Sequence, residues 1–315
     1  MEQHVAKANL IKKEIQKVVI GKDEVIHKVL TAILAKGHIL LEDIPGVGKT
    51  TLALAFSKAM ELEYHRLQFT PDVLPSDVVG FHMYSKDGSE AIYKPGSIIC
   101  NMFLADEINR TSSKTQSALL EVMEEGKVTV DSVTMEIPKP FTVIATQNPI
   151  GSVGTQMLPE SQLDRFMVRL SMGYPDIVSE VEILKGRQSK EPLSDVKRVI
   201  RKEELLFIQQ MVDNIYVHDA VYEYIARLVL NTREHDLIAL GVSPRGSLAL
   251  TSMAKANAFL KGRNYVIPDD VISVFKDVTA HRMVLQPKAR VNHVTVQDLI
   301  DNILGQVPAP RLIVN

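Results

Sequence analysis

The feature that most constrains this chain is the segment from residue 39 to 51, where an apolar strand runs into a glycine-bearing loop ending in Gly-Lys-Thr. A strand, a loop and a helix start in this order are typical of a phosphate-binding P-loop. A triphosphate needs inward-pointing backbone N–H groups, an ammonium group and a hydroxyl group for Mg²⁺ at one place. We expect Lys49 to reach the β- and γ-phosphates and Thr50 to hold the metal. The residues expected to bind the nucleotide are Pro45, Gly46, Val47, Gly48, Lys49, Thr50 and Thr51.

One position departs from the P-loop pattern G-x-x-x-x-G-K-[ST]. Its first glycine falls at position 43, where this chain has Asp43. Aspartate tolerates turn conformations better than most residues, so we expect the loop to form with the Asp43 carboxylate pointing away from the phosphates. The alternative is a chance strand, turn and helix, and the rest of the chain must decide between the two.

Composition bounds the class of protein. A length of 315 residues predicts two domains, and a formal net charge of -2 gives no general electrostatic reason to bind nucleic acid or a membrane. Cys100 is the single cysteine and lies in an apolar run, so we expect it to be buried and no disulfide framework to form. We see neither a secretory signal nor a run long enough to span a membrane, which predicts a soluble cytoplasmic protein.

Up to about residue 174, apolar strands alternate with amphipathic helices, which predicts an α/β fold with a parallel sheet and helices on both faces. Ser113 and Gln116 predict a capping box at one helix start. Two hairpins, over 82–93 with a turn at Lys86-Asp87-Gly88 and over 128–135, interrupt the alternation. The expected helices span 4–18, 22–36, 49–60 and 113–125, and the expected strands span 64–69, 102–107 and 141–146.

After residue 174 the hydrophobic pattern becomes helical. Proline and polar residues mark breaks and helix starts. We therefore expect an α/β nucleotide-binding core over 1–174 and an all-helical domain over 175–315. The expected helices of the second domain span 177–189, 202–214, 218–233, 244–261, 268–282 and 295–304.

A second nucleotide signal stands at residues 102–107, an apolar strand that ends in Asp106 and Glu107. In an open parallel sheet the ligand lies beyond the carboxyl ends of the strands, so this pair would emerge beside the P-loop. Asp106 would then order Mg²⁺ and Glu107 would act as general base on the water that attacks the γ-phosphate. A solvated Asp-Glu pair at a strand end is the plainer interpretation.

A series of motifs in this chain resembles the MoxR family of AAA+ ATPases: Gly-Val-Gly-Lys-Thr, Leu-Ala-Asp-Glu-Ile-Asn-Arg, Lys-Thr-Gln-Ser-Ala-Leu-Leu-Glu-Val-Met-Glu-Glu, Ala-Thr-Gln-Asn-Pro, Leu-Pro-Glu-Ser-Gln-Leu-Asp-Arg-Phe and Gly-Val-Ser-Pro-Arg. The resemblance covers the chain from about residue 18 to its C-terminal helices. It implies a P-loop AAA+ core followed by an all-α lid, with ATP and Mg²⁺ bound between neighbouring subunits of a ring, usually a hexamer. It also implies that the hairpins are a helix-2 insertion and a hairpin before the sensor 1 strand.

The resemblance assigns roles to three further residues. Asn148 matches sensor 1, although Asn-Pro alone is a turn starter. Arg245 matches sensor 2, and Arg165 matches the arginine finger that reaches the neighbouring subunit's site, with Arg169 and Arg110 as competitors for that role. An intramolecular salt bridge is the other interpretation of Arg165. The shared site would then take Lys49, Thr50, Asp106, Glu107, Asn148 and Arg245 from one chain and Arg165 from the next. More weakly, Ile20 and Gly21 resemble the segment that lies against adenine.

The resemblance favours an ATP-hydrolysing chaperone or remodelling factor for client enzymes or complexes. Such proteins often act with a separate von Willebrand factor A domain protein, so we expect such a partner besides a protein client. A nucleic-acid motor or loader is the first alternative, but the hairpin tips at 86–90 and 130–132 are mixed or acidic rather than basic. A nucleotide switch without hydrolysis is the second, and the presence of Glu107 argues against it.

Overall fold

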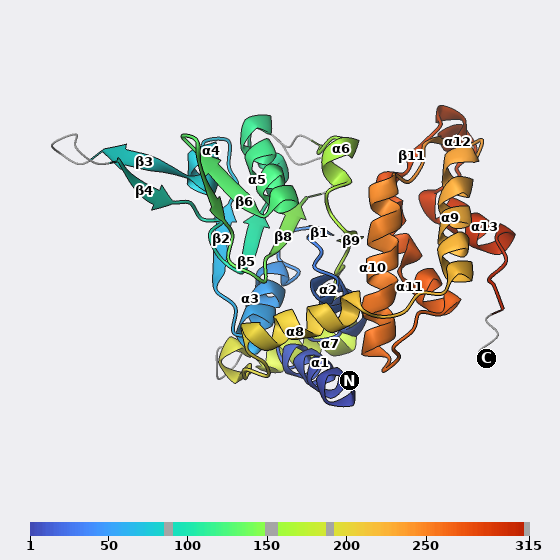
Figure 1. Ribbon diagram of the computed structural model, residues 1–315, viewed down its shortest axis with the longest axis horizontal. Helices are drawn as coiled ribbons and strands as arrows, with labels where there is room; N and C mark the ends of the chain where they lie inside the picture. The colour runs from blue at the N-terminus through green and yellow to red at the C-terminus, as the bar shows by residue number, and fades with distance from the viewer. Residues whose placement is uncertain (85–90, 149–156, 187–191, 312–315) are drawn as a thin grey trace.

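The computed structural model describes residues 1–84, 91–148, 157–186 and 192–311. Its centre is a sheet of five parallel strands in the order β2-β5-β8-β1-β9 (Figure 1). The strands are β1 (Ile39–Glu42), β2 (Tyr64–Gln68), β5 (Met102–Asp106), β8 (Thr142–Gln147) and β9 (Val168–Leu170). Four of them are predicted above. Strand β9 is a new finding, because three residues with an arginine in the middle are too short to show a strand pattern.

Both faces of the sheet are covered, because alternate residues of each strand enter different hydrophobic clusters. Ile39 and Leu41 pack with α1 (Glu2–Gln16), α2 (Asp23–Leu34) and α3 (Lys49–Ala59), whereas Leu40 packs on the opposite side with α5 (Ser113–Glu125). The expected parallel sheet with helices on both faces is confirmed.

The predicted capping box at the start of α5 is wrong by one residue. Ser112, and not Ser113, is the N-cap, and its hydroxyl accepts a hydrogen bond from the Thr115 N–H. The Gln116 side chain is buried and donates instead to the carbonyl of Ile108. Two consecutive serines offer two possible caps, and the burial of Gln116 selects the first.

Two hairpins stand outside the central sheet. The first comprises α4 (Pro75–Val79), β3 (Gly80–Tyr84) and β4 (Ala91–Pro95), and Figure 1 shows it projecting away from the lid. Its predicted turn at Lys86-Asp87-Gly88 lies outside the described residues. The second comprises β6 (Lys127–Val130) and β7 (Val133–Glu136). A hydrogen bond of 2.9 Å between His82 Nδ1 and the Asp131 carboxylate joins the two hairpins.

The C-terminal part is mainly helical, as predicted. Its helices are α7 (Ile177–Gly186), α8 (Lys202–Asp213), α9 (Asp219–Glu234), α10 (Pro244–Leu260), α11 (Pro268–Thr279), α12 (Pro287–Val291) and α13 (Val296–Gln306). Two features differ from an all-helical expectation. A short antiparallel pair, β10 (Ile238–Leu240) and β11 (Val284–Leu285), joins two connections, and the helix expected over 268–282 ends at Thr279 in a 3₁₀ turn.

The segment after β9 packs first on the N-terminal helices and only then enters the lid. The Val199 N–H donates to the carbonyl of Ala59 at 2.8 Å, and Lys7 pairs with Glu204 on α8 at 2.5 Å. Helix α6 (Glu160–Leu163) precedes β9. The division at residue 174 stays a prediction.

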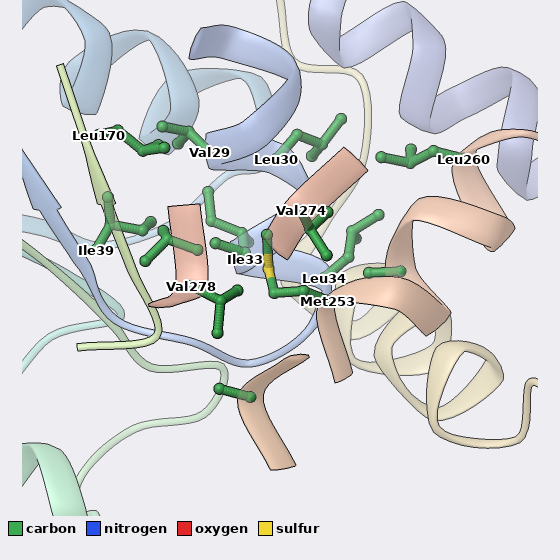
Figure 2. Close-up of a cluster of buried hydrophobic side chains, with 14 of the residues drawn as sticks. Val29, Leu30, Ile33, Leu34, Ile39, Leu170, Met253, Leu260, Val274 and Val278 are labelled. Atoms are coloured by element: carbon green, nitrogen blue, oxygen red, sulfur yellow. The ribbon is translucent and has the colours of Figure 1, made fainter. Parts of the chain in front are cut away.

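One hydrophobic cluster joins the sheet to the lid. Figure 2 shows its centre, where side chains of α2 meet those of β1, β9 and the lid helices α10 and α11. The labelled residues are Val29, Leu30, Ile33, Leu34, Ile39, Leu170, Met253, Leu260, Val274 and Val278. Because this interface is apolar and closely packed, the lid holds a defined position relative to the sheet.

Candidate nucleotide site

The P-loop connects β1 to α3, as the sequence predicts. Gly46 (φ 86°) and Gly48 (φ 95°) both adopt positive φ, a region that favours glycine. Gly48 is the N-cap of α3, and no side chain caps that end of the helix. The first N–H groups of α3 are thus available to an anion, and the helix dipole favours negative charge there.

Lys49 is 8% exposed and lies folded over the loop. Its ammonium group donates to the carbonyls of Asp43 at 2.8 Å and Ile44 at 3.2 Å. Burial lowers the pKa of Lys49, and the carboxylates of Asp43, Asp106 and Glu107 oppose that effect. The cation is therefore influenced by Asp106 and Glu107, which the sequence assigns to metal binding and catalysis, and by Asp43.

Asp43 explains why the loop forms without the first glycine of the pattern. Its φ is not positive, so the position needs no glycine. The carboxylate accepts hydrogen bonds from Ser171 Oγ and the Gly173 N–H, both at 3.1 Å, and from the Met172 N–H. It thus points toward the segment after β9, and its orientation relative to bound phosphates stays a prediction.

Asp106 and Glu107 stand at the end of β5, beside the end of β8. The Thr146 hydroxyl donates to Asp106 at 2.6 Å and accepts from the Glu107 N–H at 2.8 Å. Arg66 on β2 pairs with the other oxygen of Asp106 at 2.7 Å. The backbone of Glu107 has the left-handed conformation, with φ 59° and ψ 48°, and this turns its side chain out of the line of the strand.

Three donors hold the Glu107 carboxylate. Asn148 Nδ2 donates to one oxygen at 2.8 Å, and Gln68 Nε2 and Arg110 Nη1 donate to the other at 2.9 Å each. The Asn148 Oδ1 atom is buried and has no partner among the described residues. Asn148 therefore lies beside the candidate general base and keeps an acceptor free, as a residue that orients water requires.

Arg165 and Arg245 lie together at a different place. Both pair with Glu124 on α5, Arg165 at 3.2 Å and Arg245 through the other carboxylate oxygen. Arg169 instead pairs with Glu42 at the end of β1 at 3.1 Å, and Arg110 pairs with Glu107. The two competitors for the arginine finger are thus engaged beside the P-loop of their own chain.

The pair of arginines lies at the amino edge of the sheet, where the parallel strands begin, and the P-loop lies at the carboxyl edge, where they end. Arg165 precedes the first residue of β9, and the Met167 N–H donates to the carbonyl of His38, which precedes β1. His38 in turn bonds to the carbonyl of Met123, next to Glu124, at 2.9 Å. The four residues of β1 span about 13 Å at about 3.3 Å per residue. The structure therefore places Arg245 with Arg165, and not with Lys49 as expected.

The segment that we expect to face adenine lies near the carboxyl edge of the sheet. Gly21 has φ 69°, and a Cβ atom there would stand 2.0 Å from Ser179 Oγ on α7. Lys22 donates to the carbonyl of Tyr174 at 2.8 Å. Gly21 is thus required for a close approach to α7, and the contact of Ile20 and Gly21 with adenine stays a prediction.

The sequence analysis missed several residues that hold the site. Thr146 orients both Asp106 and Glu107, and Arg66 and Gln68 reach them from β2. A signal for the last two exists, because polar residues two apart at a strand end share one face. Glu124 lies in one of the motifs quoted above, but that motif assigns it no role.

These groups fit a nucleoside triphosphate with Mg²⁺. The open helix end and Lys49 suit phosphates, and the Thr50 hydroxyl and Asp106 carboxylate are hard oxygen ligands of the kind that Mg²⁺ prefers. The free Asn148 acceptor suits a water molecule. Fold and site together define a P-loop nucleotide-binding protein with a helical lid.

Comparisons with known proteins agree with this class and make it more specific. Residues 38–168 match the family model of the ATPase family associated with various cellular activities (AAA), and residues 230–303 match that of the AAA lid domain. The chain is 48% identical over 296 residues to the uncharacterised protein YeaC of Bacillus subtilis, covering 94% of this chain and 92% of that one. It is 38% identical over 308 residues to chaperone MoxR1 of Mycobacterium tuberculosis, covering 95% and 81%.

A solved structure shows the same architecture. The crystal structure of a candidate ATPase from Cytophaga hutchinsonii superposes with a TM-score of 0.90 at 36% identity, covering 98% of this chain and 96% of that one. This chain belongs to the MoxR family of AAA+ ATPases. Within the described residues, no helix is both long enough and apolar enough to cross a membrane.

Proposed function

We propose that this protein hydrolyses ATP at sites shared between subunits of a homo-oligomeric ring, and uses the cycle to remodel protein clients during maturation or assembly. The observation that carries this proposal is the separation of the two halves of the site. Lys49, Asp106, Glu107 and Asn148 gather at the carboxyl edge, and Arg165 with Arg245 lies at the amino edge.

The residues at the carboxyl edge would bind ATP and activate the attacking water. Lys49 and the first N–H groups of α3 would bind the β- and γ-phosphates, and Thr50 and Asp106 would hold Mg²⁺, which would offset phosphate charge. Glu107 accepts a proton from the water that attacks the γ-phosphorus, while the bond to the ADP oxygen breaks. Asn148 lies where it can orient that water, because its amide already bonds to Glu107 at 2.8 Å.

The two arginines at the amino edge, Arg165 and Arg245, would act in the nucleotide site of the neighbouring subunit. A guanidinium group from Arg165 stabilises the charge that develops on the transferred phosphoryl group. Since Arg245 shares the Glu124 partner, both arginines enter the neighbouring site together. A head-to-tail contact of this kind generates a ring, and the family resemblance favours six subunits.

Client contact is best supported at the first hairpin. Phe81 and Met83 lie on one face of β3, and Ile92 is the β4 residue paired with Met83. They are 44%, 47% and 51% exposed. Exposed apolar side chains on a projecting hairpin suit an unfolded protein segment better than nucleic acid. Capture experiments test the protein client and the separate von Willebrand factor A domain partner that this proposal expects.

The proposal is tested by mixing two variants, each inactive alone. Lys49→Ala removes the ammonium group proposed to bind the phosphates, and Arg165→Ala removes the proposed arginine finger. In mixed assemblies, some Arg165→Ala subunits receive an intact arginine pair from a Lys49→Ala neighbour, so ATP turnover returns. Subunit exchange is confirmed by native mass spectrometry. If exchange is complete and no turnover returns, the site is not shared in this way.

A further inference from the structure

Asp164, the residue before Arg165, connects the amino edge to the lid. Ser243 Oγ lies 3.0 and 2.9 Å from the two carboxylate oxygens of Asp164. Arg282 Nε donates to one of the same oxygens at 2.7 Å. Both partners come from the lid, Ser243 from the start of α10 and Arg282 from the turn after α11.

Arg282 also fixes the main chain on both sides of Arg165. Its Nη2 atom donates to the carbonyls of Asp164 at 3.0 Å and Phe166 at 2.7 Å, and its Nη1 atom donates to that of Met167 at 3.2 Å. The side chain of Arg282 is nearly fully buried. A buried guanidinium with this many partners has one orientation, so the backbone that carries Arg165 is held by the lid.

The same contacts fix Arg245. Ser243 is the N-cap of α10 and accepts from the Gly246 N–H at 3.2 Å, and Arg245 lies between the two in the first turn. A Cβ atom on Gly246 would stand 2.9 Å from Arg282 Cδ, so α10 starts directly against Arg282. One carboxylate therefore meets the turn that carries Arg245 and the segment that carries Arg165.

We propose that Asp164 is a positioning residue that holds Arg165 and Arg245 as one rigid unit, through Ser243 and Arg282, for delivery to the neighbouring subunit's γ-phosphate. This inference rests on the proposed function. Nothing in the motif assigns such a role to Asp164, whose carboxylate is engaged by Ser243 and Arg282. Loss of Asp164 then loosens the spacing of the two arginines while leaving both side chains present.

The test places Asp164→Asn in one chosen subunit of the mixed assembly. In the Lys49→Ala subunit, which supplies the arginine pair, it lowers the recovered kcat by about 10- to 100-fold, because small displacements of catalytic groups have effects of this size. The KM for ATP at the intact P-loops stays unchanged. In the Arg165→Ala subunit, whose arginine pair is already incomplete, the same substitution leaves the recovered rate unchanged.

Three controls separate positioning from general damage. Glu160→Gln makes the same charge change on exposed α6 and leaves the recovered rate unchanged in either subunit. Ser243→Ala lowers the rate and Ser243→Thr, which keeps the hydroxyl, restores it. Thermal melting and subunit exchange confirm folding. Equal losses from Asp164→Asn in both subunits, or none in either, overturn this inference, whereas failure of the parent mixture to regain turnover overturns the shared site itself.

Discussion

The carboxyl edge of the sheet holds its groups through contacts between neighbouring strand ends, whereas the amino edge holds its arginines through a lid that lies more than a hundred residues away in sequence. Thr146, on the strand next to β5, orients Asp106 and Glu107. By contrast, Arg282 and Asp164 are 118 residues apart, and Arg245 and Glu124 are 121 apart. One half of the site is a property of the sheet, and the other depends on how two domains pack.

The largest expected effect is on turnover at the carboxyl edge. Glu107→Gln keeps the shape of the side chain and can still accept from Asn148, but it removes the proton acceptor. We expect kcat to fall by about 10²- to 10⁴-fold, the usual contribution of a general base. Phosphate release measures turnover, and a fluorescent ATP analogue should bind as tightly as before.

Glu234→Gln, an equal change on the exposed surface of α9, serves as the control and leaves turnover intact. Unchanged turnover in Glu107→Gln would support a nucleotide switch in place of a hydrolase. Loss of nucleotide binding would instead show that Glu107 holds the P-loop together.

The second effect is on stability at the amino edge. Arg282→Ala leaves Asp164 without its buried cation, and breaking a buried pair costs about 3–5 kcal/mol in the free energy of unfolding. Arg245→Ala removes a pair between two exposed side chains, worth about 0.2–1 kcal/mol. Urea unfolding of the two variants measures both values.

Arg282 and Arg245 should differ in what their loss does. Arg245→Ala should lose ATP turnover while keeping its stability, whereas Arg282→Ala should lose stability. If Arg245→Ala unfolds as readily as Arg282→Ala, then Arg245 is needed for the stability of its own subunit. It would then not be available to act in a neighbouring subunit's site.

The same contrast explains what sequence could predict. Lys49, Asp106, Glu107 and Asn148 each follow a buried strand, and parallel strands end at one edge, so their meeting could be inferred. That the loop forms with Asp43 in it could also be inferred, but not its partners Ser171, Met172 and Gly173, which are 128 to 130 residues away in sequence. The position of Arg245 could not, because it depends on the apolar packing of α10 against α2. A motif can indicate that an arginine acts at a nucleotide site, but not whether that site belongs to its own subunit or to a neighbouring one.

A third effect depends on pH and again concerns the amino edge. His38 is partly buried between β1, α5 and β8, and its loss of solvation there lowers its pKa to about 4 from 6.5. Its Nδ1 atom accepts from the Val143 N–H at 3.0 Å, which leaves no room for a second proton. Because the folded pKa is depressed, His38 favours the folded state above pH 6.5 and loses that contribution as pH falls toward 4.

Between pH 7 and 5, this residue alone should reduce the free energy of unfolding by about 2 kcal/mol, from a pKa difference of about 1.4 kcal/mol per unit. His38→Gln cannot bind the proton, so its stability should fall less over the same range. Urea unfolding at both pH values gives the difference. Parallel curves for the two proteins would place the acid sensitivity elsewhere, for example at His281, whose pKa burial also lowers.

The last effect tests the link between the P-loop and the rest of the carboxyl edge. Asp43→Gly restores the glycine of the P-loop pattern but removes the acceptor for Ser171, Met172 and Gly173. A hydrogen bond to a charged group contributes about 1.5–3 kcal/mol, so the loss of these three should lower the free energy of unfolding by at least about 2 kcal/mol. Nucleotide affinity should not rise. Asp43→Asn keeps the shape of the side chain but accepts weaker hydrogen bonds. Its free energy of unfolding should therefore lie between that of the unchanged protein and that of Asp43→Gly. A more stable Asp43→Gly protein would mean that the loop is held by its own backbone, and that Asp43 is a tolerated departure from the pattern rather than the attachment of the P-loop to β9.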